Sequence, residues 1–251
     1  MAGIVPLRVN DTWVRITGEL VDPRYVFVVD KVGRNLVSDL SAAGVNPRDQ
    51  VVTFSSGSFK NINNFLQMKR QEYNKTEAFV FLWIGQEEIS EEAPANVSET
   101  IEKYFHPNGP RVIPLHDVNG VASSYMDLVR ESLNFFPNAR IFSTDAVPRR
   151  SSGFCITRAN YVSKKVIQQS ERHHHFALNK HFHGRRSGAC IDELGGRFPI
   201  HEWKFEDGVF PTTDAWAAVL RRSYAAISSV MGKEQNDPDL SASLKLVNIR
   251  Y

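Results

Sequence analysis

The sequence predicts an α/β protein, a three-layer α/β/α sandwich around a mostly parallel central sheet. Four short segments are apolar at consecutive positions, a pattern typical of strands that are covered on both faces. Longer segments with helical spacing of apolar residues lie between them, and such alternation indicates a parallel sheet. With 251 residues, 42% of them apolar, the chain has enough core for one domain over residues 1–232. Residues 233–251 form a polar tail that is either mobile or packed at an edge.

The four predicted strands are rich in β-branched and aromatic residues. They are Tyr25–Val29, Val51–Phe54, Ala78–Trp83 and Arg140–Thr144. We expect a sheet of four or five mostly parallel strands. The carboxyl ends of such strands carry the functional groups in folds of this kind.

Five helices are predicted between and after these strands. Their ranges are Arg34–Ala43, Asn61–Glu72, Val121–Asn134, Thr157–Phe176 and Asp214–Met231. In the last of them Trp216, Leu220 and Tyr224 fall on one face at helical spacing, which predicts an amphipathic helix. Two segments do not fit the alternation. Gln86–Gly120 is acidic and carries a candidate strand at Arg111–Leu115, and Gly184–Gly208 is expected to be a surface excursion with a short strand.

The overall charge gives no attraction to a polyanion or a membrane. There are 30 Lys and Arg residues against 28 Asp and Glu residues, a net charge of +2. No apolar run reaches the ~18 residues of a membrane helix, and no secretory signal is recognisable. Two cysteines, Cys155 and Cys190, favour a reducing intracellular setting, and we expect the cytoplasm rather than the nucleus.

The charge is unevenly distributed along the chain. The segment from Glu72 to Asp117 is acidic, whereas Arg140–Cys190 is basic and holds five of the eight histidines. This asymmetry predicts a polarised surface. Because His173, His174 and His175 would fan out around a helix, no metal site is expected, and no cofactor is expected either.

The residues at the strand ends and before the last helix form short sequence motifs in a defined order. They are VVDKVGRNL, FSSGSF, WIGQEEI, AVPRR and FEDGVFPTTDAW. Their order and spacing, from about Tyr25 to Val230, resemble the SGNH (GDSL-type) hydrolase family. That family has Gly-Asp-Ser-Leu, a glycine, Gly-x-Asn-Asp and Asp-x-x-His at the corresponding places. Pro148-Arg149-Arg150, followed by a segment with Asn160, is similar to SGNH-like domains in the first open reading frame of non-LTR retroelements. The related C-terminal domain of Oskar is similar too.

At three positions the chain departs from the family pattern. Lys31 stands at the position of the nucleophilic serine, Glu87 at that of the oxyanion-binding asparagine, and Phe210 at that of the general-base histidine. What remains is Gly57, Gly85 and Asp207. Serine hydrolysis needs a hydroxyl, a base and donors aimed at the oxyanion, so the resemblance implies a pseudoenzyme. Lys31 and Glu87 would follow neighbouring strands in this fold, and they could form an ion pair that fills the former pocket.

These departures favour binding over catalysis. The resemblance to Oskar-like domains implies an RNA-binding or protein-binding module. The basic segment Arg149–Arg186 is the predicted nucleic-acid surface, since guanidinium and ammonium groups contact phosphates. The residues predicted to contact RNA are Arg149, Arg150, Arg158, Lys165, Arg185 and Arg186.

Two alternatives remain open. In one, the protein self-assembles, the acidic Glu87–Glu102 face of one copy meeting the basic face of another. In the other, it is an esterase whose nucleophile has moved to Ser55, Ser56 or Ser58, although serines around a turn glycine ordinarily bond to local backbone. No membrane partner is expected.

Overall fold

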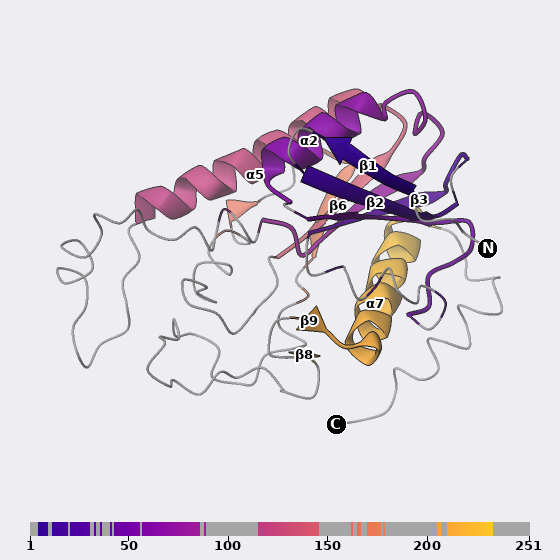
Figure 1. The fold of residues 1–251 in the computed structure, drawn as a ribbon. Coiled ribbons are helices and arrows are strands. Elements are labelled where there is room, and N and C mark those ends of the chain that lie inside the picture. The colour runs from indigo at the N-terminus through magenta and orange to yellow at the C-terminus, as the bar shows by residue number, and fades with distance from the viewer. Residues whose placement is uncertain are drawn as a thin grey trace.

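The computed structural model of the chain describes ten stretches and several single positions (Figure 1). The stretches are 5–9, 12–19, 21–30, 43–55, 57–85, 115–145, 165–166, 170–176, 205–206 and 210–232. The single positions are 33, 36, 41, 88, 162 and 178. Within these residues no helix is long and apolar enough to cross a membrane.

A seven-stranded sheet forms the centre of the molecule, in the order β1-β2-β4-β3-β5-β6-β7. Strands β4, β3, β5, β6 and β7 are parallel, and β1 and β2 extend the β4 side as an antiparallel hairpin. The bounds are β1 (Val5–Val9), β2 (Thr12–Gly18), β3 (Tyr25–Val29), β4 (Gln50–Phe54), β5 (Ala78–Leu82), β6 (Arg140–Thr144) and β7 (His173–Phe176). A separate two-stranded sheet consists of β8 (Phe205–Glu206) and β9 (Phe210–Pro211).

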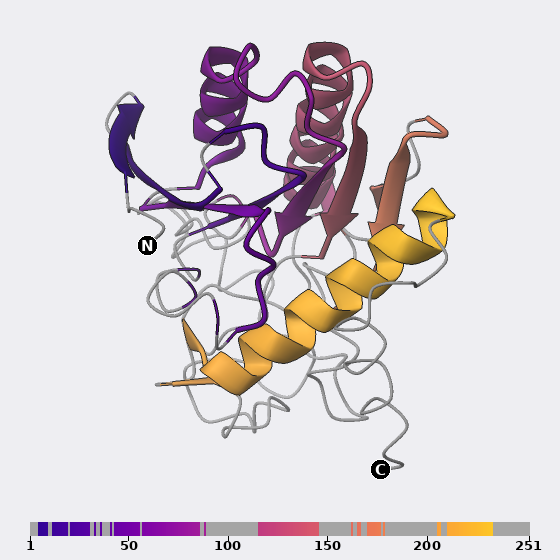
Figure 2. The ribbon, with the colours of Figure 1, turned by 90° about the vertical axis from the view of Figure 1, so that its right-hand side faces the viewer.

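Helices cover both faces of the parallel strands. On one face lie α2 (Phe59–Met68) and α5 (Leu115–Phe135), and on the other lies α7 (Thr213–Met231) (Figure 2). Every residue of β3, β4 and β5 is buried. Their side chains alternate between two cores, one under α2 and α5 and one under α7. The predicted three-layer α/β/α fold is confirmed.

The predicted strands agree closely with the observed ones. β3 and β6 have the predicted bounds, and β4 and β5 differ by one residue at one end. Three predicted helices correspond to α2, α5 and α7. The last begins where the Thr212 side chain accepts a hydrogen bond from the N–H of Ala215, and it ends at Gly232, whose φ of 63° lies in the left-handed region.

The helix predicted over Thr157–Phe176 is wrong at its carboxyl end. Residues 170–172 form a turn, and His173–Phe176 is the edge strand β7, parallel to β6. The Arg172 guanidinium donates to the carbonyl oxygens of Leu133, Phe136 and Ala139, where α5 ends, at 3.1–3.3 Å. Pairing with β6 and this capping of α5 stabilise a strand where the apolar spacing alone predicted a helix.

Other differences lie at the N-terminus and before α5. No element was predicted before Tyr25, yet β1 and β2 form there. They differ from the predicted strands because one of their faces is exposed, so their apolar residues alternate with polar ones. Leu115 of the candidate strand Arg111–Leu115 begins α5, and residues 111–114 lie outside the described part.

A buried carboxyl group ties α7 to the amino ends of β3 and β4. Asp49 is 1% exposed and accepts hydrogen bonds from the Tyr224 hydroxyl, at 2.5 Å, and from the N–H of Tyr25, at 3.2 Å. Burial raises the pKa of Asp49 to about 6. The Tyr224 oxygen in turn accepts a bond from the N–H of Asn46 at 3.0 Å.

We expect Tyr224→Phe to lower the free energy of unfolding by about 1–3 kcal/mol, because a buried carboxyl and a backbone N–H lose their partner.

Between pH 4 and 6 the folded protein holds a proton on Asp49 that the unfolded chain releases. The contribution of Asp49 to stability therefore falls as pH rises through this window. Loss of the Tyr224 bond should steepen that fall. Urea unfolding at pH 4.5 and 7 measures both effects, and Asp49→Asn should abolish the pH effect if Asp49 is its source.

Candidate functional site

The sheet topology places a candidate site at the carboxyl ends of β3, β4 and β5. The strand β3 lies between β4 and β5, and the chain moves from it first to one side and then to the other. Such a switch in strand order leaves a crevice at the carboxyl edge in α/β sheets of this kind. The residues that follow these three strands belong to the short sequence motifs VVDKVGRNL, FSSGSF and WIGQEEI.

The ends of β3 and β4 are joined by one carboxylate. Asp30 is fully buried, and its Oδ1 accepts a hydrogen bond from the N–H of Gly57 at 3.0 Å. A Cβ atom at position 57 would lie 2.4 Å from that oxygen, so only glycine fits there. The loop after β4 therefore packs its backbone directly against Asp30.

The end of β5 packs against the start of α2. Trp83 and Gly85 both have left-handed backbone, with φ of 52° and 85°, so the chain turns sharply as it leaves the strand. A Cβ atom at Gly85 would approach Phe59 Cζ to 2.8 Å. The Glu88 carboxylate accepts a 2.6 Å hydrogen bond from the N–H of Phe59, at the positive end of the α2 dipole.

The described serines near this edge have local structural partners. Ser58 begins α2 and accepts a hydrogen bond from the N–H of Asn61 at 3.3 Å. Ser55 Oγ accepts from the N–H of Trp13 in the neighbouring strand at 2.9 Å. The histidines whose side chains are described, His173–His175, belong to β7, which three strands separate from β4. The described residues thus bring no histidine to Ser55 or Ser58.

The three consecutive histidines point alternately to the two faces of β7. Ser143 Oγ lies 2.8 Å from both His173 Nε2 and His175 Nδ1, on the α5 side of the sheet. On the opposite side, the ring of His174 lies 5.4 Å from that of Phe142. The expectation that these histidines fan out around a helix is wrong, because they lie in a strand.

Ser143 and His173 of this cluster are fully buried and His175 is half-buried, and burial changes how His175 titrates. Desolvation, helped by neighbouring His173, lowers the pKa of His175 to about 4, so the ring is neutral at neutral pH. The described residues contain no group of three metal-binding side chains. The cluster joins β6 to β7, and its Ser143 is inaccessible to substrate.

Most predicted site residues lie outside the described part of the chain. Lys31, Glu87 and Asp207 are among these, as are Arg149, Arg150, Arg158, Arg185 and Arg186. Phe210 begins β9, but its side chain is not described, and Lys165 is exposed. Gly57 and Gly85 lie at the strand ends as the resemblance implies. The sequence reasoning missed Asp30 and Glu88, although both directly flank family positions.

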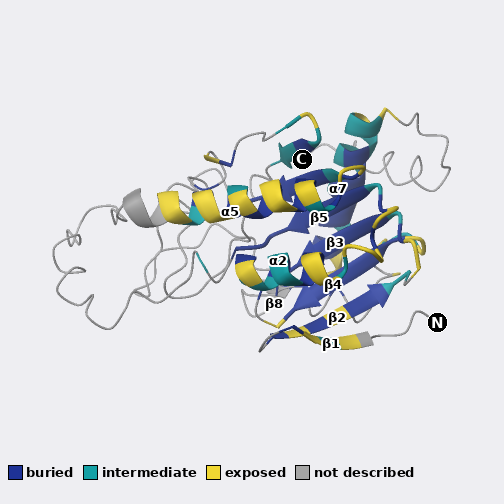
Figure 3. Ribbon diagram, turned by 90° about the horizontal axis from the view of Figure 1, so that it is seen from above, coloured by how far each residue is buried: buried dark blue, intermediate teal, exposed yellow. Residues whose placement is uncertain are grey.

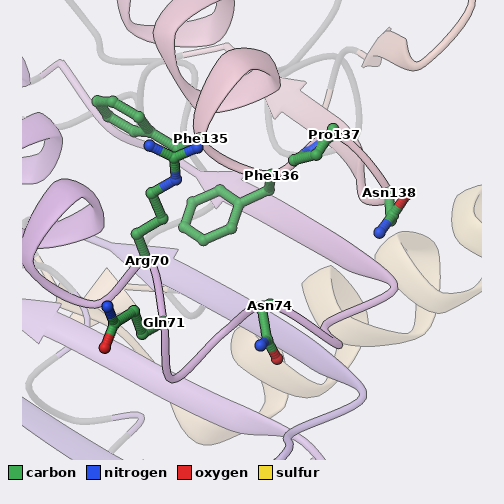
Figure 4. Close-up of a pocket in the computed structure, with 7 residues that line it drawn as sticks. All are labelled: Arg70, Gln71, Asn74, Phe135, Phe136, Pro137 and Asn138. Carbon is green, nitrogen blue, oxygen red and sulfur yellow. The ribbon is translucent and has the colours of Figure 1, made fainter.

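A shallow hollow of about 370 Å³ lies at the opposite, amino-terminal edge of the sheet. Figure 4 shows its lining, in which Arg70 and Asn74 follow α2 and Phe135 and Asn138 stand at the end of α5. It is remote from the strand ends described above, because α2 and α5 lead back to the amino ends of β5 and β6.

The sequence matches no known protein family and no curated protein, whereas the fold resembles that of solved structures. A Streptococcus pneumonia protein whose name refers to platelet activating factor aligns with a TM-score of 0.52 at 12% identity. The alignment covers 82% of this chain and 85% of that protein. A family two carbohydrate esterase from Cellvibrio japonicus aligns with a TM-score of 0.42 at 13% identity, over 87% of this chain and 64% of the esterase. The likeness to the Streptococcus pneumonia protein shows a shared α/β fold.

We expect Gly57→Ala to lower the free energy of unfolding by about 1–3 kcal/mol, because the added methyl group meets the Asp30 carboxylate. Gly120→Ala is the matched control. Gly120 lies in α5 with open space around it, so alanine there should raise stability by about 0.5–1 kcal/mol. Urea unfolding at pH 7 measures both; equal effects of the two changes would contradict the close packing at Gly57.

A second prediction concerns acid stability. Between pH 6.5 and 4 the unfolded chain binds a proton at His175 that the folded protein does not, so this group destabilises the fold as pH falls. We expect His175→Asn to remove this loss. The free energy of unfolding of the variant, relative to that of the wild type, should therefore be higher at pH 5 than at pH 7. Comparing the two at each pH cancels the opposite dependence of Asp49. A stability difference that is independent of pH would contradict the prediction.

Proposed function

We propose that this chain is a hydrolytically inactive SGNH-type domain that acts by binding, with RNA as its ligand. The observation that carries the first half is the identity of two residues, Lys31 at the family position of the nucleophilic serine and Phe210 at that of the general-base histidine. An ammonium group does not replace a serine hydroxyl, and a phenyl ring cannot accept a proton. The Asp30–Gly57 hydrogen bond keeps the loop after β4 packed against the end of β3 without these groups.

The neighbouring positions support the same proposal. Glu88 is bonded to the start of α2 and Ser58 caps that helix, so each has a structural partner. The identities of Lys31, Glu87 and Phe210 remove the nucleophile, the oxyanion-binding amide and the base of the family pattern. Loss of one oxyanion donor alone costs roughly 10²–10³ in rate. An ion pair between Lys31 and Glu87 stays a prediction, supported by the adjacency of β3 and β5.

Binding of RNA is supported by the charge of the segment Arg149–Arg186 and by the resemblance to retroelement and Oskar domains. Of its predicted contact residues, Lys165 is exposed to solvent. Arg172, by contrast, is engaged with the end of α5 and is better regarded as structural. Binding of a protein partner, or self-assembly through the acidic segment Glu87–Glu102, is the alternative that the same charge asymmetry supports.

The proposal predicts that the purified protein neither hydrolyses short p-nitrophenyl esters nor reacts with fluorophosphonate probes, which label activated serines. An active SGNH esterase run in parallel shows that the assay works. Labelling that Ser55→Ala, Ser56→Ala or Ser58→Ala abolishes would overturn the proposal in favour of a relocated nucleophile.

For RNA binding, we expect fluorescence anisotropy to detect binding of a single-stranded oligonucleotide at about 50 mM salt, where electrostatic attraction is strong. The logarithm of the binding constant should fall with the logarithm of salt concentration, with a slope of roughly −0.7 per phosphate contacted. Replacing both Arg149 and Arg150 by Glu should abolish binding. Absence of binding together with a salt-sensitive oligomer would favour self-assembly.

A further inference from the structure

The hairpin of β1 and β2 extends the sheet beyond the cover of α7. On the α2 side its residues Val9, Val14 and Ile16 are buried in the core. The core under α7 contains residues of β3, β4, β5 and β6 but none of the hairpin. Figure 3 shows exposed residues on β1, next to the buried central strands. One face of this hairpin is therefore open to solvent.

This open face carries an aromatic ring between two basic side chains. Its exposed residues are Pro6, Arg8, Trp13 and Arg15. Trp13 is 56% exposed and lies directly opposite Arg8 in the strand register. Arg15 follows on the same face of β2, about 6.8 Å further along the strand.

The backbone of Trp13 is held by the neighbouring segment, although the ring of Trp13 is exposed. Its N–H donates to Ser55 Oγ and its carbonyl oxygen accepts from the N–H of Ser55, both at 2.9 Å. The strand therefore presents the indole without needing to order a loop. An aromatic side chain on a strand that is already ordered requires no ordering of backbone when a planar ligand stacks on it.

We propose that this Arg8–Trp13–Arg15 face binds single-stranded nucleic acid, with a base stacked on the Trp13 indole and backbone phosphates beside the guanidinium groups. The proposal rests on the proposed RNA-binding function and adds a second contact surface to it, independent of Arg149–Arg186. Stacking platforms flanked by positive charge are the usual means of binding single strands without sequence preference.

The chemistry of the face disfavours the other occupants. A second copy docking here would bring arginines against arginines. Addition of a further strand to the β1 edge is hindered by Pro6, which has no N–H to donate. A polyanion that offers flat rings matches both the charge and the indole.

The test titrates a fluorescein-labelled twelve-nucleotide oligouridylate into the full chain at about 50 mM salt. We expect Trp13→Ala to weaken binding about tenfold, Trp13→Phe to retain most of it, and Arg15→Gln to reduce the salt slope by about 0.7. Met68→Ala is the matched control, because Met68 is an equally exposed apolar residue, 58%, on α2, and it should change nothing. Circular dichroism verifies that each variant is folded.

A second measurement locates the contact directly. Photocrosslinking of an oligonucleotide containing 4-thiouridine should attach the label to the peptide with Trp13. If the wild type binds and Arg149→Glu with Arg150→Glu abolishes binding, but the hairpin variants bind normally, the hairpin proposal is wrong and the proposed function stands. If the wild type binds no oligonucleotide, both are overturned. Self-association that depends on Trp13 would identify the face as a protein interface and would also overturn this proposal.

Discussion

Complete burial of the central parallel strands is the constraint on which the rest of the structure depends. The residues of β3 are between 0% and 6% exposed, and those of β4 and β5 are just as deeply buried. Such strands are stable only with apolar layers on both faces, which α2, α5 and α7 supply. Because the strand interiors hold little polar chemistry, polar side chains collect at the strand ends, where the chain enters its loops.

In this protein the polar groups at the strand ends stabilise loops. Asp30, Glu88 and Asp145 each accept a hydrogen bond from a backbone N–H of another segment. A buried carboxylate needs such donors, since burying an unpaired charge costs far more free energy than these hydrogen bonds contribute. The described polar groups at these strand ends thus join one segment to another.

The sequence predicted the buried parts well and the half-exposed parts poorly. β3 was located to the residue because it is an unbroken apolar run, and β6 because Ile141 and Phe142 stand in a short segment that also ends in the β-branched Thr144. β7 was missed because its buried residue is His173, whose cost of burial Ser143 offsets by hydrogen bonding, and no hydropathy pattern records that. The strand-end glycines were identified through the family resemblance. Their partners Asp30 and Phe59 were not, since the close approaches that require glycine exist only in three dimensions.

The helical layers cover only part of the sheet, and the uncovered part is where a sheet face is accessible to a ligand. α7 covers the parallel strands, and β1 and β2 lie beyond it, so that a regular, rigid piece of sheet meets solvent on one face. Flat strand faces hold side chains in a fixed register, here Arg8 opposite Trp13. At the strand ends, by contrast, the described carboxylates Asp30 and Glu88 are bonded to backbone N–H groups of the loop and helix that follow β4. The hairpin face and the strand ends thus use their polar side chains differently, the first facing solvent and the second holding segments together.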